Sequence, residues 1–285
     1  MPTEEMARRP GPDRLSVLKP RFMLKTMALL LAFAAILPAQ TTQPGKGKQV
    51  VDAAVQALGG ERFLNMHTRR TTARIYSFFH DQMSGYDVAN IYTQYLDDKS
   101  IKGLQVRERE VLGKKQDYSY LFLADQGFDI TFRGARPLPD ERWAYYNRTT
   151  NNDILYLLRY RYNEPGMQYD YVGDQVFIAT HVYVVDITDA AGNTVQVYFD
   201  FNTKLPVRQS FKWLDEETRQ HMDEITEFDK WRDVGDGIMW PYTIERERNG
   251  YKFYQIFASK VEINAELPAN IFDLPKGAQI LKKVN

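Results

Sequence analysis

The sequence contains no cysteine among its 285 residues. Disulfides, thiolate nucleophiles, cysteine-ligated zinc, iron–sulfur clusters and lipidation of an N-terminal cysteine are therefore excluded. The chain also lacks an excess of charge of either sign, since 37 Lys and Arg balance 37 Asp and Glu. Because nucleic-acid binding depends mainly on positive charge, we expect no nucleic acid among its partners.

Motifs of reaction chemistry are missing as well. The sequence has no G-x-S-x-G elbow, no G-x-x-x-x-G-K-[ST] loop, no G-x-G-x-x-G after a strand and no H-E-x-x-H pair. The four histidines are widely spaced, so we expect neither a metal nor a cofactor. Asp223, Glu224 and Glu227 could act as the acid and base of a glycosidase, but their alternation with apolar residues indicates a solvated strand face. The sequence therefore predicts a protein that is not an enzyme.

Long hydrophobic runs are scarce. The run ALLLAFAAILPA at 28–39 is shorter than the roughly 20 residues that a membrane-spanning helix needs. Arg21 and Lys25 precede this run, and a proline followed by a small residue ends it, which is the pattern of a secretory signal peptide. We predict a signal peptide with a long n-region at 1–39, with an uncleaved anchor as the alternative, and hence secretion across the inner membrane to the periplasm of a bacterium. Three methionines could each start this segment: Met1, Met23 and Met27.

The rest of the chain is rich in regularly patterned apolar residues, with 44% hydrophobic and 13% aromatic residues in the whole sequence. After a linker at 40–48, residues 49–285 are predicted to form one domain. Apolar residues recur at helical spacing up to Gly59-Gly60, which is typical of a helix end. A segment that begins near Pro139 predicts one or two further helices.

Most of the remaining sequence alternates apolar and polar residues between turn-forming clusters. Two of the predicted strands run through 128–134 and 175–189, and SGYD at 84–87 is predicted to be a turn. So many successive antiparallel strands must curl to bury one face. The predicted fold is mainly β (α+β): a single curved antiparallel sheet that forms an unclosed half-barrel, covered on its concave side by the N-terminal helix and the mid-chain helices.

Bulky apolar residues gather on one face of the predicted strands 193–201 and 205–214. An ordinary sheet core would explain each of them equally well. However, two or three helices cannot cover the whole concave face of so long a sheet, and an uncovered part would form a hydrophobic cavity. The predicted lining residues of this cavity are Val195, Val197, Phe199, Phe201, Val207, Phe211, Trp213 and Trp240.

Four segments in this order resemble a known family: DQGFDITFRGARPLPDE at 125–141, FDFNTKLPVR at 199–208, DGIMWPYTIE at 236–245 and SKVEINAELPANIFDLP at 259–275. Together with the signal peptide and the N-terminal helix, they are similar to the LolA-like outer-membrane lipoprotein-sorting family (the LolA/LolB/LppX-like superfamily). One departure is Gly127-Phe128, where relatives commonly carry Gly-Trp. The residues that match are Leu205, Pro206, Val207, Arg208, Asp236, Gly237, Ile238, Pro241, Tyr242, Val261, Asn264, Leu267, Phe272, Leu274 and Pro275.

The resemblance implies a periplasmic carrier or chaperone whose cavity binds the acyl chains of lipoproteins or other lipids. Its partners would then be lipids and envelope membrane transport proteins. Each CH₂ group of a lipid chain that the cavity removes from water would stabilise the complex by about 0.8 kcal/mol. Two further interpretations remain open: an envelope sensor of the same fold that binds a protein partner, and a non-catalytic ligand-binding protein. The family also uses a functional cation early in its sheet, for which Arg107, Arg109 and Arg133 are the candidates.

Overall fold

The structure is a computed structural model that describes residues 45–98, 100–215 and 218–284. The predicted signal peptide at 1–39 lies outside the described residues. Contacts within the chain separate residues 1–41 from residues 42–285, and everything described here belongs to the second unit. None of the helices in its described part is long and apolar enough to cross a bilayer.

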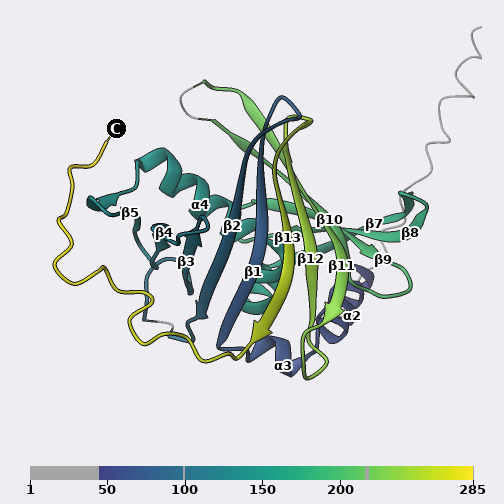
Figure 1. Ribbon diagram of the computed structural model, residues 1–285. Helices are drawn as coiled ribbons and strands as arrows, with labels where there is room; N and C mark the ends of the chain where they lie inside the picture. Colours follow the sequence, from purple (N-terminus) through teal and green to yellow (C-terminus); the bar gives the residue numbers. More distant parts are fainter. Residues whose placement is uncertain (1–44, 99, 216–217, 285) are drawn as a thin grey trace, which may run out of the picture. The chain divides into compact units, whose positions relative to one another are not determined.

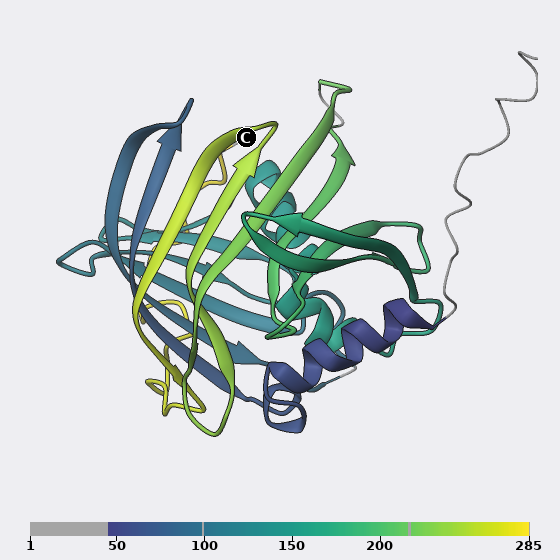
Figure 2. The ribbon, with the colours of Figure 1, turned by 90° about the vertical axis from the view of Figure 1, so that its right-hand side faces the viewer.

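The described residues form one antiparallel sheet, with the strand order β6-β5-β4-β3-β2-β1-β13-β12-β11-β10-β9-β8-β7. The first and last strands of the domain, β1 and β13, pair at the middle of this sheet, while β6 and β7 end it without pairing with each other. The sheet is therefore a half-barrel, whose curvature is visible in Figures 1 and 2. The strands are β1 (Thr68–Phe79), β2 (Gln82–Tyr95), β3 (Val106–Leu112), β4 (Tyr118–Phe122), β5 (Gly127–Thr131), β6 (Gly134–Pro137), β7 (Gln168–Phe177), β8 (Thr180–Thr188), β9 (Thr194–Asp200), β10 (Pro206–Leu214), β11 (His221–Asp233), β12 (Met239–Arg248) and β13 (Tyr251–Ile263).

Three local predictions of strands and turns were wrong. The β1–β2 turn falls at His80-Asp81, so that 84–87 belongs to β2, and the segment 175–189 turns at Ile178-Ala179 between β7 and β8. Both of these turns place two consecutive non-glycine residues at positive φ, a conformation that Gly or Asn normally signals in a sequence. The segment 128–134 likewise contains a turn between β5 and β6.

Helix α2 (Lys46–Ala57) covers the β7–β9 part of the concave face. Its apolar stripe buries Val50, Val51 and Ala54 in the largest hydrophobic cluster. A Cβ on Gly47 would lie 2.3 Å from the carbonyl oxygen of Tyr169, so the first turn of α2 packs directly on β7. The helix begins at Lys46, within the segment 40–48 that the sequence assigns to a linker, and a short helix, α3 (Glu61–Leu64), follows it.

The mid-chain helices lie on the same concave side (Figures 1 and 2). They are α4 (Asp140–Asn152), α5 (Ile154–Tyr156) and a π-helical turn, η1 (Leu157–Arg161). Pro139 precedes α4, and Asp140 and Glu141 in its first turn complement the helix dipole, as the sequence predicts. The helix cover of the half-barrel is thus confirmed.

The C-terminal tail crosses the convex side of β3–β5 and protects the sheet edge at β6. Arg109 donates hydrogen bonds to the carbonyl oxygens of Ile271 (3.1 Å) and Asp273 (3.2 Å). Further along, the N–H of Ala135 donates to Gln279 O (2.9 Å), and the N–H of Leu281 donates to Ala135 O (2.9 Å). Covering an edge strand in this way blocks pairing with other chains.

Candidate functional site

A cavity of about 400 Å³ lies between α4 and the concave faces of β1–β3, β12 and β13. Its apolar wall includes Ile91, Ile244 and Ile256. Polar and charged side chains form the rest of the wall: Arg69, Ser77, Thr93, Glu108, Glu110, Arg142, Thr149, Thr150, Asp153 and Arg246. The cavity is therefore amphipathic, whereas the sequence predicts a hydrophobic one.

Helix α4 forms the roof of the cavity through one of its faces. Arg142, Tyr145, Tyr146, Thr149 and Thr150 line the cavity, and their spacing places them on one side of the helix. Only Thr149 of α4 is buried, so the helix is attached mainly by side chains at its surface. The ring of Tyr146 stacks on Phe122 of β4 with centroids 3.7 Å apart. The roof is therefore held by partly buried rings, Trp143 and Tyr146, and not by a fully buried apolar stripe like that of α2.

The junction between α4 and α5 is held by Gln209, a fully buried residue of β10. Its Oε1 accepts a hydrogen bond from Ile154 N (2.7 Å), and its Nε2 donates to Asn152 O (3.0 Å). Asp153 lies between these two residues in an extended conformation and caps α5, because its Oδ1 accepts from the N–H groups of Leu155 and Tyr156. One glutamine thus satisfies the backbone exposed by the helix break.

An ion pair occupies one side of the cavity. The guanidinium of Arg69 lies 3.3 Å from Glu108 Oε2 and donates to Thr93 Oγ1 (3.0 Å). Thr93 in turn donates to the same carboxylate oxygen (2.9 Å). Arg69 also lies over the ring of Trp240, 4.4 Å from its centroid. Side chains from β1, β2 and β3 therefore form one hydrogen-bonded group in which the charges of Arg69 and Glu108 neutralise each other.

The carboxyl group of Glu110, unlike that of Glu108, has no ion-pair partner in the described residues, and its pKa is raised. Burial, reinforced by the neighbouring charge of Glu108, raises its pKa from 4.5 to about 7, against the opposing influence of Arg142 and Arg246. Burial also raises the pKa of Asp153, again against Arg246. Near neutral pH, Glu110 is therefore only partly ionised.

A third acidic residue, Glu224, lies in a different environment from the predicted one. Glu224 is fully buried on the concave side, where the sequence indicates a solvated strand face. Its carboxylate accepts from Thr149 Oγ1 (3.3 Å) and pairs with Arg248 (3.3 Å). Because its neighbours Asp223 and Glu227 project to the other face of β11, the three carboxylates do not form an acid–base pair.

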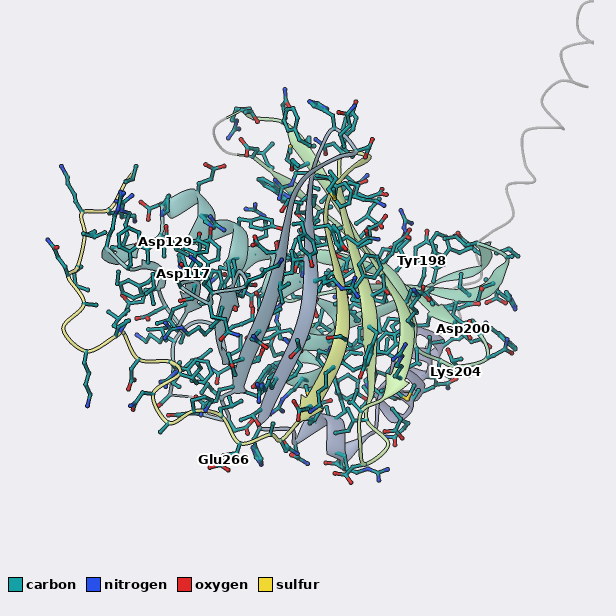
Figure 3. The ribbon with its side chains drawn as sticks, in the orientation of Figure 1. Asp117, Asp129, Tyr198, Asp200, Lys204 and Glu266 are labelled. Carbon is teal, nitrogen blue, oxygen red and sulfur yellow. The ribbon has the colours of Figure 1, made fainter. Side chains whose placement is uncertain are left out.

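Of the eight predicted lining residues, Trp240 lines this cavity and the other seven do not. Val195, Val197, Phe199 and Phe211 are buried in the cluster beneath α2. Their part of the sheet, which ends in the β9–β10 turn marked by Asp200 and Lys204, is at the opposite end from Asp117 and Asp129 near β4 and β5 (Figure 3). Where the sequence predicts a cavity, α2 fills the space.

The remaining three predicted lining residues, Phe201, Val207 and Trp213, lie in other parts of the structure. A register shift in β10 turns Val207 to the opposite face, where it packs with Val182 and Val184. Phe201 is 37% exposed and stacks on His181. Trp213 borders a second, polar hollow of about 400 Å³ together with Phe211, and Arg148 lies 3.4 Å above its ring.

None of the three candidate arginines reaches the cavity. Arg107 and Arg109 alternate along β3 with the cavity-lining Glu108 and Glu110, so they project to the convex side. Arg133 is exposed in the β5–β6 turn. The cations that do line the cavity, Arg69, Arg142 and Arg246, were missed by the sequence analysis. The available signal was their alternation with apolar residues: Arg69 shares a strand face with Ala73 and Ile75, and Arg246 shares one with Ile244.

Comparison with solved structures places this geometry in a known fold. A candidate outer membrane lipoprotein-sorting protein domain from Vibrio parahaemolyticus has a TM-score of 0.52 at 10% identity, covering 80% of this chain and 97% of that one. A DUF1329 family protein from Desulfovibrio piger has a TM-score of 0.56 at 14% identity, covering 79% and 96%. The fold is LolA-like. At such identities the likeness establishes the fold alone, and the sequence itself matches no protein-family model and no curated protein.

Proposed function

We propose that the protein is a non-enzymatic carrier that holds the acyl chain of a lipoprotein or another lipid in the cavity beneath α4. The observation that carries this proposal is the cavity itself, which lies on the concave face of a half-barrel with the fold of a lipoprotein-sorting domain. Its volume of about 400 Å³ falls within the roughly 300–1,000 Å³ typical of ligand sites. The predicted signal peptide would place such a carrier in the periplasm.

The energetics favour this role over catalysis. An acyl chain against Ile91, Ile244 and Ile256 would gain about 0.8 kcal/mol for each CH₂ group removed from water, without any reactive group. Loading and release require that the roof opens. Helix α4 is suited to this because it is attached mainly through partly buried side chains such as Trp143 and Tyr146, with Thr149 as its one fully buried residue.

The test asks whether the protein carries lipid when it is purified and whether the delipidated protein takes up a lipid probe. Native mass spectrometry with lipid extraction, on chain purified from its own cell envelope, should detect bound lipid or acylated peptide. A fluorescent fatty-acid probe should bind the delipidated protein, and Ile244→Trp, which fills the cavity, should abolish that binding. The matched control is Ile225→Trp, because Ile225 is on the neighbouring strand β11 and projects to the other face.

Two outcomes would contradict the proposal. If the protein carries no lipid and takes up no probe, it is not a lipid carrier, and a sensor that binds a protein partner becomes the better interpretation of the fold. If the probe binds but Ile244→Trp and Ile225→Trp weaken it equally, the ligand is held outside the cavity.

A further inference from the structure

Arg246 lies in the wall of the cavity, and no carboxylate of the described residues bonds its guanidinium directly. It is on β12, where it pairs in register with Tyr254 of β13 and Thr226 of β11. The structure shows no hydrogen bond or ion pair from its guanidinium to any residue in the described ranges, and its Nε is buried without an acceptor. An unsatisfied buried donor costs about 1–3 kcal/mol, so its presence calls for a compensating role.

Two of the neighbouring carboxylates are already engaged. Glu108 is held by Arg69 and Thr93. Glu224 is held by Arg248 and accepts a hydrogen bond from the roof helix. Neither can neutralise Arg246 without breaking a contact that the structure already contains.

The other two carboxylates near Arg246 make no hydrogen bond or ion pair with it among the described residues, although Asp153 attracts its charge from a distance. Asp153 uses one oxygen to cap α5, and burial disfavours its charged form. Burial and repulsion from Glu108 do the same for Glu110, whose pKa rises to about 7. Burial lowers the pKa of Arg246, but Tyr145, Tyr254, Asp153 and Glu224 raise it by more, so Arg246 stays positively charged in the free protein.

The surroundings of Arg246 define what could pair with it. Tyr145 of α4 and Tyr254 of β13 line the cavity on either side, and the guanidinium carbon lies 5.5 Å from the centre of the Tyr254 ring. On the same face of β12, Ile244 is one pleat away, at about 7 Å along the strand, and it pairs with Ile256 of β13. A charged position thus adjoins an apolar wall within one cavity.

We infer that the ligand is an anionic amphiphile whose carboxylate or phosphate pairs with Arg246 while its chain lies along Ile244 and Ile256. The planar guanidinium suits both groups, because it can donate two parallel hydrogen bonds to either one. This inference rests on the proposed carrier function and specifies the head group that the carrier selects. It also accounts for an arginine that has no hydrogen-bond or ion-pair partner among the described residues.

The experiment compares three probes that share one alkyl chain: palmitate, hexadecyl phosphate and uncharged methyl palmitate. Each displaces a fluorescent fatty-acid probe from the delipidated protein at pH 7. We expect both acids to bind at least tenfold more tightly than the ester, and the stronger of the two identifies the preferred head group. Arg246→Met should lower the affinity for both acids to that of the ester and leave the ester unchanged. The matched control, Arg74→Met, alters an exposed arginine of β1 and should change nothing.

The outcomes separate this inference from the carrier function. Equal binding of all three probes, with no effect of Arg246→Met, would overturn the role of Arg246 and leave the carrier intact. No binding of any probe would reject the carrier itself. The comparison of acid with ester uses the unaltered chain, so it tests whether the cavity selects an anionic head group even if Arg246→Met unfolds. Arg246→Lys then tests the role of Arg246 itself, because it keeps the charge but loses the planar fork and should weaken the binding of both acids.

Discussion

Replacing Glu110 by glutamine should stabilise the protein at alkaline pH and have little effect in acid. In the folded state the pKa of this carboxyl rises from 4.5 to about 7, chiefly through burial. The folded protein therefore binds a proton that the unfolded chain releases between these two pH values, and stability falls as the pH rises through that window. Below pH 4.5 the carboxyl is protonated in both states and the penalty vanishes.

The size of the effect follows from the two pKa values. Each pKa unit corresponds to about 1.36 kcal/mol, so the ionised carboxylate of Glu110 destabilises the fold by about 3 kcal/mol at pH 8. At pH 5 the same calculation leaves less than about 1 kcal/mol. Glutamine has nearly the same shape and carries no charge, so Glu110→Gln should remove the penalty at pH 8.

Urea unfolding at pH 5 and pH 8 measures this difference directly, with the slope of the transition held common to both proteins. The control is Glu266→Gln, because Glu266 is exposed in the C-terminal tail (Figure 3) and should show no pH-dependent difference. A gain of the same size at both pH values, or a loss at pH 8, would show that Glu110 is not destabilised by its buried charge.

Three further substitutions test how the site is supported. Gln209→Leu should lower the free energy of unfolding by about 1–3 kcal/mol, because Ile154 N loses its buried acceptor, and urea denaturation measures the loss. Arg109→Met should release the tail, seen as faster amide hydrogen exchange at 278–282, while unchanged exchange would mean that the tail binds without this clamp. Tyr146→Ala removes the stack that attaches α4 to β4, so stopped-flow measurements should show faster release of a bound fatty-acid probe.

The half-barrel could be predicted because the signals that specify it are local. Alternating residues define the strands, and turns such as Asn249-Gly250 have the expected chemistry, with both residues at positive φ. The turns at His80-Asp81 and Ile178-Ala179 could not be predicted, because their sequences carry no Gly or Asn signal. There the flanking strand pairs impose the backbone conformation, which is a tertiary effect.

The position of the cavity could not be predicted from strand patterns. Phe199 of β9 and Ile256 of β13 are both inward apolar residues, and nothing in their own strands distinguishes a filled site from an open one. The distinction depends on which helix crosses each part of the sheet. The buried valines and alanine of α2 fill the space beside β9, whereas the tyrosines and threonines of α4 leave a gap above β13.

The two parts of the concave face therefore contribute differently to the free energy of folding. Beneath α2 the packing is apolar and sealed, and it contributes to stability in the usual way. Beneath α4, burial opposes the charge of Glu110 and leaves the Nε of Arg246 without an acceptor, and both effects lower the stability of the free protein. Proteins retain such conflicts where function requires them. A ligand that accepts hydrogen bonds from Arg246 would remove the cost of its unsatisfied donor. The free energy recovered in this way would add to the affinity for that ligand.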